Sequence, residues 1–494
     1  MSKIYDFVII GSGPAGSVIA KRLCEAGASC LLLEAGQDFK AEEYPENELN
    51  ANSRLLWNGG MDANRNADML FLRGKAVGGG SVVNQCLLDR FDDIAWDSWQ
   101  QATGIDWFNQ QSMANYYQQV ESDLSLHEMQ RQDWNRNAEL YVESFEKCGY
   151  QWAPLRRGQA DCGKGNDCMR CLGGCPRESK QSMPVTYLRR AIAAGLDVQA
   201  GFEVNSVIEG QHFVSICGQQ QVAGTVKKTF KSAVVYARHC VLAAGALGTT
   251  KLLLNSGYGD AVAGLGKNFY CHPQFMTLAR MAEVVDAHKG AFQAVKSNDP
   301  RFREQGFKLE NVFAGPIAVA MLKPGSGKQH QRFMQNYRHL ACMEVAIRDV
   351  NPGTISTGKD GRLKIEKVLG EEDRQRARAG NDVVRTLFES VGALEILQSP
   401  LKIGLHLMGG CAIGKKDAVV DEQFQLQGSS RLRVVDSSIF PNAPGINPSL
   451  TIMALAHRAA DEILQHAGSS LSTARASNRV QSASAKPSNV EVSV

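Results

Sequence analysis

The 494-residue sequence lacks any long apolar segment: no stretch approaches the ~20 consecutive apolar residues that a transmembrane helix needs. It also lacks a strong net charge. The formal value of +3 is too small to favour a nucleic-acid partner. The first residues run directly into an apolar strand at residues 7–10, which leaves no room for an export signal. We therefore expect no nucleic acid as partner and no integral membrane protein. The expected location is the cytoplasm, or outside it if a signal-bearing partner exports the chain.

The 13 cysteines are not expected to form a disulfide framework. The chain is large and shows no export signal, and thiols in the cytosol are kept reduced. Four of them nevertheless lie close together, Cys162, Cys168, Cys171 and Cys175. The spacing Cys-x2-Cys-x3-Cys-Pro is that of the last three ligands in bacterial ferredoxins, so an iron–sulfur cluster is one interpretation. Four thiolates also form a closed zinc site, and unligated thiols are the third possibility. Spacing alone leaves the three open.

Alternating strands and helices predict the fold class. An apolar run at residues 7–10, a glycine turn, an amphipathic run at 15–26 and an apolar run at 30–33 form a βαβ unit with parallel strands. Similar alternations recur at residues 240–254 and 432–464. We predict an α/β, Rossmann-like dinucleotide-binding domain, discontinuous over residues 1–90, 160–268 and 400–467.

The remaining segments predict an inserted antiparallel-sheet substrate domain, formed by residues 91–159 and 269–399. Residues 307–350 favour β-structure, and Asp360-Gly361 is typical of a hairpin turn between Thr354–Thr357 and Leu363–Val368. Residues 372–396 place apolar side chains on one helical face that can cover this sheet. Residues 468–494 contain little to bury and are predicted to form a disordered tail.

The glycine turn has the spacing of a dinucleotide-binding motif. Gly11 permits a tight turn, Gly13 lets the backbone approach a pyrophosphate, and Gly16 allows close packing of helix against strand. Glu34 ends the second strand, where an acid accepts a hydrogen bond from a ribose hydroxyl. The motif does not separate FAD from NAD, and a glycine-rich turn without a ligand is the alternative.

Three further segments can meet a flat cofactor. A glycine run at 78–80 lets the backbone lie against a ring, with Ser81 and Asn84 able to hydrogen-bond its edge. Asp436 follows a strand, as a ligand-binding or a turn-forming residue. Pro448 stands near the first turn of a helix whose positive end favours negative charge on a reduced flavin.

These segments resemble known signatures. Residues 73–84, from Arg73 to Asn84, resemble the first signature of the glucose–methanol–choline (GMC) oxidoreductases, and residues 243–246 match another FAD-domain segment. Residues 406–411, 434–441 and 445–448 look like the C-terminal signature of that family. The Gly-Gly-Cys after His406 and the single Asn447 are most similar to its cholesterol-oxidase-like branch.

The resemblance implies FAD as cofactor, so the predicted Rossmann-like domain is expected to be an FAD-binding domain. The residues it assigns to FAD are Gly11, Gly13, Gly16, Glu34, Gly79, Ser81, Asn84, Val204, Ala244, Asp436 and Pro448. Some relatives carry a histidine covalently bonded to FAD just before the asparagine of the first signature, where this chain has Val83. Valine cannot form that bond, so we expect non-covalent FAD.

The catalytic residues implied by the resemblance are His406 and Asn447, whereas His272 is interpreted as structural. An alcohol becomes a good hydride donor as its hydroxyl proton leaves, so a base is needed; His406 is assigned that role and Asn447 holds the substrate oxygen. The predicted reaction is oxidation of the CH–OH group of a primary or secondary alcohol, with hydride transfer to flavin N5; a sugar and a sterol-like alcohol are both candidates.

The fate of the electrons is predicted from the cysteine loop, which is similar to that of iron–sulfur GMC dehydrogenases. It favours a carrier other than NAD, such as an acceptor protein or a quinone. Two alternatives stay open: an oxidase that forms hydrogen peroxide, and a flavin electron-transfer subunit whose partner performs the chemistry.

Overall fold

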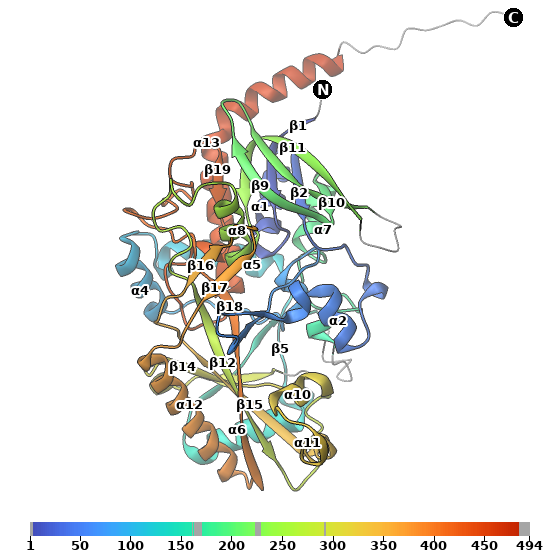
Figure 1. Ribbon diagram of the computed structural model, residues 1–494, viewed down its shortest axis with the longest axis vertical. Coiled ribbons are helices and arrows are strands. Elements are labelled where there is room, and N and C mark those ends of the chain that lie inside the picture. The colour runs from blue at the N-terminus through green and yellow to red at the C-terminus, as the bar shows by residue number, and fades with distance from the viewer. Residues whose placement is uncertain (1–2, 161, 163–169, 223–228, 291–292, 484–494) are drawn as a thin grey trace, which may run out of the picture.

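The computed structural model describes residues 3–160, 162, 170–222, 229–290 and 293–483. Two large sheets lie at different levels along the long axis of the molecule, and helices cover their outer faces (Figure 1). This arrangement is the predicted combination of an α/β cofactor-binding part with a second, sheet-rich part. None of the helices in the described part of the chain combines the length and apolarity needed to cross a membrane.

The first sheet has seven strands in the order β8-β2-β1-β11-β10-β9, with β19 also paired to β11. Their bounds are β1 Ile4–Ile10, β2 Cys30–Glu34, β8 Asp197–Ala200, β9 Phe202–Glu209, β10 Val214–Val222, β11 Thr229–Leu242 and β19 Leu432–Val434. β8, β2, β1, β11 and β19 are parallel neighbours, whereas β9 and β10 are antiparallel additions. The predicted parallel nucleotide-binding sheet is confirmed.

Helices pack on this sheet in the places that the alternation indicates. They include α1 Pro14–Glu25, α7 Tyr187–Ala193, α8 Gly245–Asn255 and α13 Ser449–Ala483. α13 contacts α1 and also α5 Gln110–Asp123, so a segment assigned to the substrate domain covers this half of the molecule. The helix continues to Ala483, past the predicted start of a disordered tail at residue 468.

The second sheet has eight strands in the order β3-β4-β18-β12-β15-β14-β13-β6. Their bounds are β3 Asp62–Ala63, β4 Met69–Phe71, β6 Trp152–Pro154, β12 Tyr270–Arg280, β13 Val295–Ser297, β14 Phe307–Asn311, β15 Leu340–Ile347 and β18 Glu395–Met408. All neighbours are antiparallel except β4 and β18. Because β3 and β4 come from the segment 1–90, this sheet draws on both groups of predicted domain segments.

Two pairs of helices flank this sheet. α6 Arg136–Cys148 and α12 Glu371–Ser390 pack on one face, and α10 Pro316–Leu322 and α11 Gly327–Gln335 lie on the other side (Figure 1). α10 and α11 interrupt the segment 307–350, whose residue types predict only strands. α12 ends at Ser390 rather than residue 396, because Gly392 takes a φ of +79°.

The predicted hairpin is confirmed as a separate two-stranded sheet. β16 Thr354–Thr357 pairs antiparallel with β17 Leu363–Glu366, and Gly361 in the turn has a φ of +71°. A second short pair joins β5 Leu126–Glu128 to β7 Arg156–Gly158. The remaining α-helices are α2 Glu48–Leu55, α3 Gly80–Val83, α4 Asp93–Thr103 and α9 Pro300–Glu304.

Candidate active site

A cleft of about 1650 Å³ is lined by residues of both large sheets. It brings together candidate site residues that are far apart in the sequence: Gly11, Gly13, Glu34, Gly79, Ser81, Asn84, Val204, Ala244, His406, Asp436, Asn447 and Pro448. Gly16 does not line the cleft and lies behind it. The structure thus assembles one site from segments that the sequence only suggests separately.

Two glycine turns form one wall of the cleft. Gly11 has a φ of +101°, and a Cβ there would lie 2.4 Å from the Ala243 carbonyl oxygen. A Cβ on Gly16 would lie 2.0 Å from the Gly11 oxygen, which confines Gly16 to packing. A Cβ on Gly13 would meet no atom within 4 Å, and one on Gly79 would lie 3.0 Å from the Gly13 Cα. Bare backbone therefore faces the open cleft, as a bound pyrophosphate requires.

Glu34 connects these two turns. Its Oε2 accepts hydrogen bonds from the Ser12 hydroxyl at 2.6 Å and the Ser12 amide at 3.1 Å, and its Oε1 accepts from the Gly36 amide at 2.7 Å. The Ser12 hydroxyl in turn accepts from the Gly78 amide at 2.8 Å. Burial raises the pKa of Glu34, although these hydrogen bonds lower it. Glu34 thus supports the loop and still lines the cleft, where its Oε1 can accept from a ribose hydroxyl.

The side chains of Ser81 and Asn84 form hydrogen bonds with backbone groups of the protein. Ser81 Oγ donates to the Gly78 oxygen at 2.7 Å and accepts from the Met183 amide at 3.0 Å. Asn84 Oδ1 accepts from the Cys86 amide at 3.0 Å. The hydrogen-bonding capacity that the sequence predicted for a flavin edge is therefore partly used within the protein.

Asp436 anchors the start of α8. Its Oδ2 accepts from the Gly245 amide at 2.8 Å and from the Thr249 hydroxyl, and its Oδ1 accepts from the Ser438 amide at 2.8 Å. Burial raises the pKa of Asp436, and the hydrogen bonds lower it. The carboxylate holds the β19 end against the N-terminus of α8, where Ala244 lines the cleft.

His406 lies at the end of β18 with a φ of +54° and contacts a second histidine. His406 Nδ1 is 3.0 Å from His272 Nδ1, and the two rings meet edge to face. His272 Nε2 accepts a hydrogen bond from the Gly445 amide at 3.0 Å. Burial and the charge of Lys308 lower the pKa of His406 to about 3, so the ring is neutral near pH 7.

Asn447 is part of a buried polar cluster that the sequence did not reveal. Its Oδ1 accepts from Lys308 Nζ at 3.1 Å, and its Nδ2 lies 3.4 Å from Glu310 Oε1. Lys308 and Glu310 form an ion pair. Burial tends to lower the pKa of Lys308, but Glu310 and neighbouring carboxylates raise it overall. Burial and the charge of Glu310 raise the pKa of Glu344 far above its usual value, which favours the neutral form of its carboxyl group.

The alternation of side chains along strands was the available signal for this cluster. Residues 308 and 310 are charged and lie two apart in a β-favouring segment, but the sequence does not show which residues lie opposite them.

An apolar wall continues from the polar cluster along the second sheet. The cleft-lining residues alternate along β12 and along β18 as far as Leu405. The apolar ones are Met276, Leu278, Leu401, Ile403 and Leu405, together with Val312 just after β14. Thr277 points to the opposite face and bonds Asn381 of α12, which confirms the alternation. Large apolar side chains at the cleft are also exposed to solvent, including Leu49 at 63% and Met61 at 60%. The substrate side therefore has one polar end and long apolar walls.

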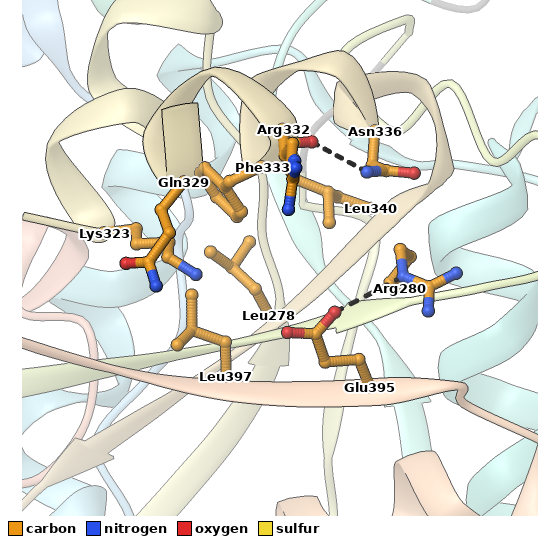
Figure 2. A pocket seen from close by; sticks show the side chains of 10 residues that line it. All are labelled: Leu278, Arg280, Lys323, Gln329, Arg332, Phe333, Asn336, Leu340, Glu395 and Leu397. Atoms are coloured by element: carbon orange, nitrogen blue, oxygen red, sulfur yellow. Dashed lines mark hydrogen bonds and ion pairs between the residues drawn. The ribbon is translucent and has the colours of Figure 1, made fainter. Parts of the chain in front are cut away.

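A smaller pocket of about 130 Å³ lies beside this wall, under α11 (Figure 2). Leu278 lines both spaces, while the Arg280–Glu395 ion pair closes part of the smaller one. Its volume is below the roughly 300–1,000 Å³ of typical small-molecule sites. We therefore place the active site in the larger cleft.

The predicted metal-binding cysteines are not gathered around a metal site in the described part of the chain. Cys168 lies outside the described residues. Cys171 Sγ accepts hydrogen bonds from Gln159 at 3.7 Å and Arg157 at 3.9 Å. The residues that the structure describes contain no group of three or more His, Cys, Asp or Glu side chains that could hold a metal ion. The iron–sulfur prediction therefore has no support from this geometry.

The sequence and fold are similar to those of known flavoenzymes. A family model described as GMC oxidoreductase matches residues 5–274, and a second with the same description matches residues 362–456. A long-chain-alcohol oxidase of Arabidopsis thaliana is 25% identical, over 93% of this chain and 67% of that protein. A cholesterol oxidase of Acinetobacter baumannii is 26% identical, over 92% of this chain and 93% of its own length.

The fold similarity extends over nearly the whole chain. The crystal structure of pyridoxine 4-oxidase from Mesorbium loti superposes with a TM-score of 0.73 at 18% identity, covering 93% of this chain and 99% of that one. The sheet-rich second part is included in this match, which confirms the predicted fold class.

Proposed function

Because the chain belongs to the GMC oxidoreductase family, an FAD-dependent family acting on alcohol-type substrates, we propose that it oxidises alcohols with a large apolar body. The carrying observation is the division of one cleft into a glycine-lined half, a polar cluster with His406 and Asn447, and an apolar wall. This division suits a cofactor, a hydroxyl group and an apolar body, in that order.

The glycine-lined half fits FAD. Gly13 and Gly79 would face the pyrophosphate with bare backbone, and Glu34 would accept from the ribose. When bound, FAD supplies the atom N5 that accepts a hydride from the CH–OH carbon. The protein's own contribution is to hold the alcohol oxygen beside His406 and Asn447 and to exclude water with the apolar wall.

The apolar wall favours the substrate class. Each methylene group that leaves water contributes ~0.8 kcal/mol, so a long or fused apolar body gains affinity from this wall. A sugar would leave its hydroxyl groups unpaired against Met276, Leu278 and Ile403. Two relatives, a long-chain-alcohol oxidase and a cholesterol oxidase, support an apolar alcohol as substrate.

The electron acceptor is proposed to be a carrier other than NAD, for example a protein or a quinone. Oxygen is the alternative acceptor, since two relatives are named as oxidases. The domain boundaries and the cytoplasmic location stay predictions from the sequence.

The test is anaerobic reduction of the bound flavin by a panel of alcohols. We expect KM to fall as the apolar chain of a primary alcohol lengthens, with sterols accepted better than sugars. Ile403→Ser should raise KM for long alcohols and leave short ones unchanged. Lys402→Ala, at the adjacent position and paired with Asp68 at 2.9 Å, is the control. Equal reduction by sugars and apolar alcohols would refute the substrate class.

A further inference from the structure

His272, expected to be only structural, contacts both candidate catalytic segments. The side chain is 3% exposed. One ring nitrogen accepts from the Gly445 amide, two residues before Asn447, and the other lies 3.0 Å from His406 Nδ1. The ring therefore joins the residue at the end of β18 to the loop that carries Asn447.

The hydrogen bonds fix the protons of both rings. A backbone amide can only donate, so His272 Nε2 carries a lone pair and the single proton of neutral His272 is on Nδ1. That N–H donates to His406 Nδ1, which must then be the acceptor. The proton of neutral His406 is consequently on Nε2.

We propose that His272 is a positioning residue that holds His406 in the Nε2–H form, so that His406 donates a hydrogen bond to the alcohol oxygen. The hydrogen bond to the alcohol rests on the proposed function, whereas the positions of the protons on the two rings do not. It replaces the base role that sequence analysis assigned to His406, because Nε2 has no lone pair in this tautomer.

The surrounding charges favour neutral rings. Burial, and after it nearby positive charges that include Lys308 and Arg303, lower the pKa of His272 well below its usual value. A protonated His272 would also point an Nε2–H at the Gly445 N–H. The donor of this bond is a position that favours glycine, because Gly445 has a φ of +73° and a Cβ there would lie 2.3 Å from Arg303 Nη1.

Two nearly isosteric substitutions separate positioning from packing. Asn in place of His272 keeps an N–H donor for His406 Nδ1, whereas Asp offers only acceptors and reverses the tautomer. We expect His272→Asn to slow anaerobic flavin reduction by roughly fivefold, the effect of one lost hydrogen bond. His272→Asp should slow it by ~10²–10³-fold, as when a transition-state donor is removed. Equal rates in the two variants would overturn the proposal.

A direct measurement does not depend on turnover. The FAD-bound protein labelled with ¹⁵N-histidine reports each tautomer by the shifts of Nδ1 and Nε2, and His406→Gln assigns the His406 signals. We expect Nε2–H in the native protein and in His272→Asn, and Nδ1–H in His272→Asp. An Nδ1–H form of native His406 would refute the inference even if alcohols reduce the flavin. The Nε2–H form without any alcohol oxidation would refute only the proposed function.

Discussion

Glu310 on β14 lies directly opposite Glu344 on β15, and the two residues are 1% and 3% exposed. Two buried carboxylates that face each other across neighbouring strands do not both ionise. Because Lys308 pairs with Glu310, Glu310 is the one that carries the charge. We therefore expect Glu344→Gln, which replaces a neutral acid by a neutral amide, to change stability little. Glu310→Gln leaves Lys308 buried without its ion-pair partner and should cost ~3–5 kcal/mol in the free energy of unfolding.

Urea unfolding of a double-mutant cycle measures this effect. Lys308→Met combined with Glu310→Gln removes both charges and should recover most of the lost stability. If the single and double variants are equally destabilised, the ion pair is not the cause. The double variant also lacks both charged groups beside Asn447, so slow flavin reduction in this folded protein would give the Lys308–Glu310 pair a part in the chemistry.

The glycine motif provides a matched pair of substitutions. Gly13→Ala places a methyl group where no protein atom lies within 4 Å, so the fold should persist while FAD affinity falls. Gly16→Ala places it 2.0 Å from the Gly11 oxygen and should destabilise the apoprotein itself. Thermal unfolding without FAD and FAD titration separate the two effects. A Gly13→Ala protein with unchanged FAD affinity would argue against a pyrophosphate at this turn.

The attachment of FAD is predicted from Val83, at the end of α3. Because valine forms no bond to flavin, acid or heat denaturation should release free FAD into the supernatant. Flavin absorbance that stays with the precipitated polypeptide would show a covalent link at another residue. Val83→His is an informative comparison, since it restores the residue that some relatives use.

Stability should fall in mild acid because of the buried histidines. The pKa of His406 is about 3 in the folded protein, against ~6.5 in an unfolded chain. Between these values the unfolded chain binds more protons, so this contribution is complete above pH 6.5 and decreases as the pH falls toward 3. Urea unfolding from pH 8 to pH 5 should show the decrease, and His406→Gln should reduce its slope. An unchanged slope would mean that other groups dominate.

The sequence predicts local geometry better than contacts between segments. The spacing of Gly11, Gly13 and Gly16 specifies a turn, and the hairpin at Gly361 follows from residue types alone. The pairing of Glu310 with Glu344 depends on strand register, which no local pattern determines. The role of Ser12, which bonds Glu34 and Gly78, was missed for the same reason.

The cysteine loop is expected to hold no metal. Cys171 Sγ accepts hydrogen bonds from the buried Arg157 and from Gln159, and the described residues contain no group of three or more His, Cys, Asp or Glu side chains that could hold a metal ion. We therefore expect protein purified anaerobically to contain neither stoichiometric iron with acid-labile sulfide nor zinc. Iron and sulfide in equal amounts would restore the cluster interpretation, and zinc without sulfide would make the loop a structural site.

The electron acceptor of the reduced flavin is identified by comparing turnover with a quinone analogue and turnover with oxygen. A flavin without a neighbouring cluster can pass both electrons to oxygen or to a quinone, so the metal content alone does not choose between them. Turnover with a quinone analogue should exceed turnover with air-saturated buffer if a carrier is the acceptor, and little hydrogen peroxide should form. Peroxide formed in equal amount to the oxidised alcohol, at a rate above that with the quinone, would make the enzyme an oxidase. Cys171→Ser is the control, because a loop that takes no part in electron transfer should leave both rates unchanged.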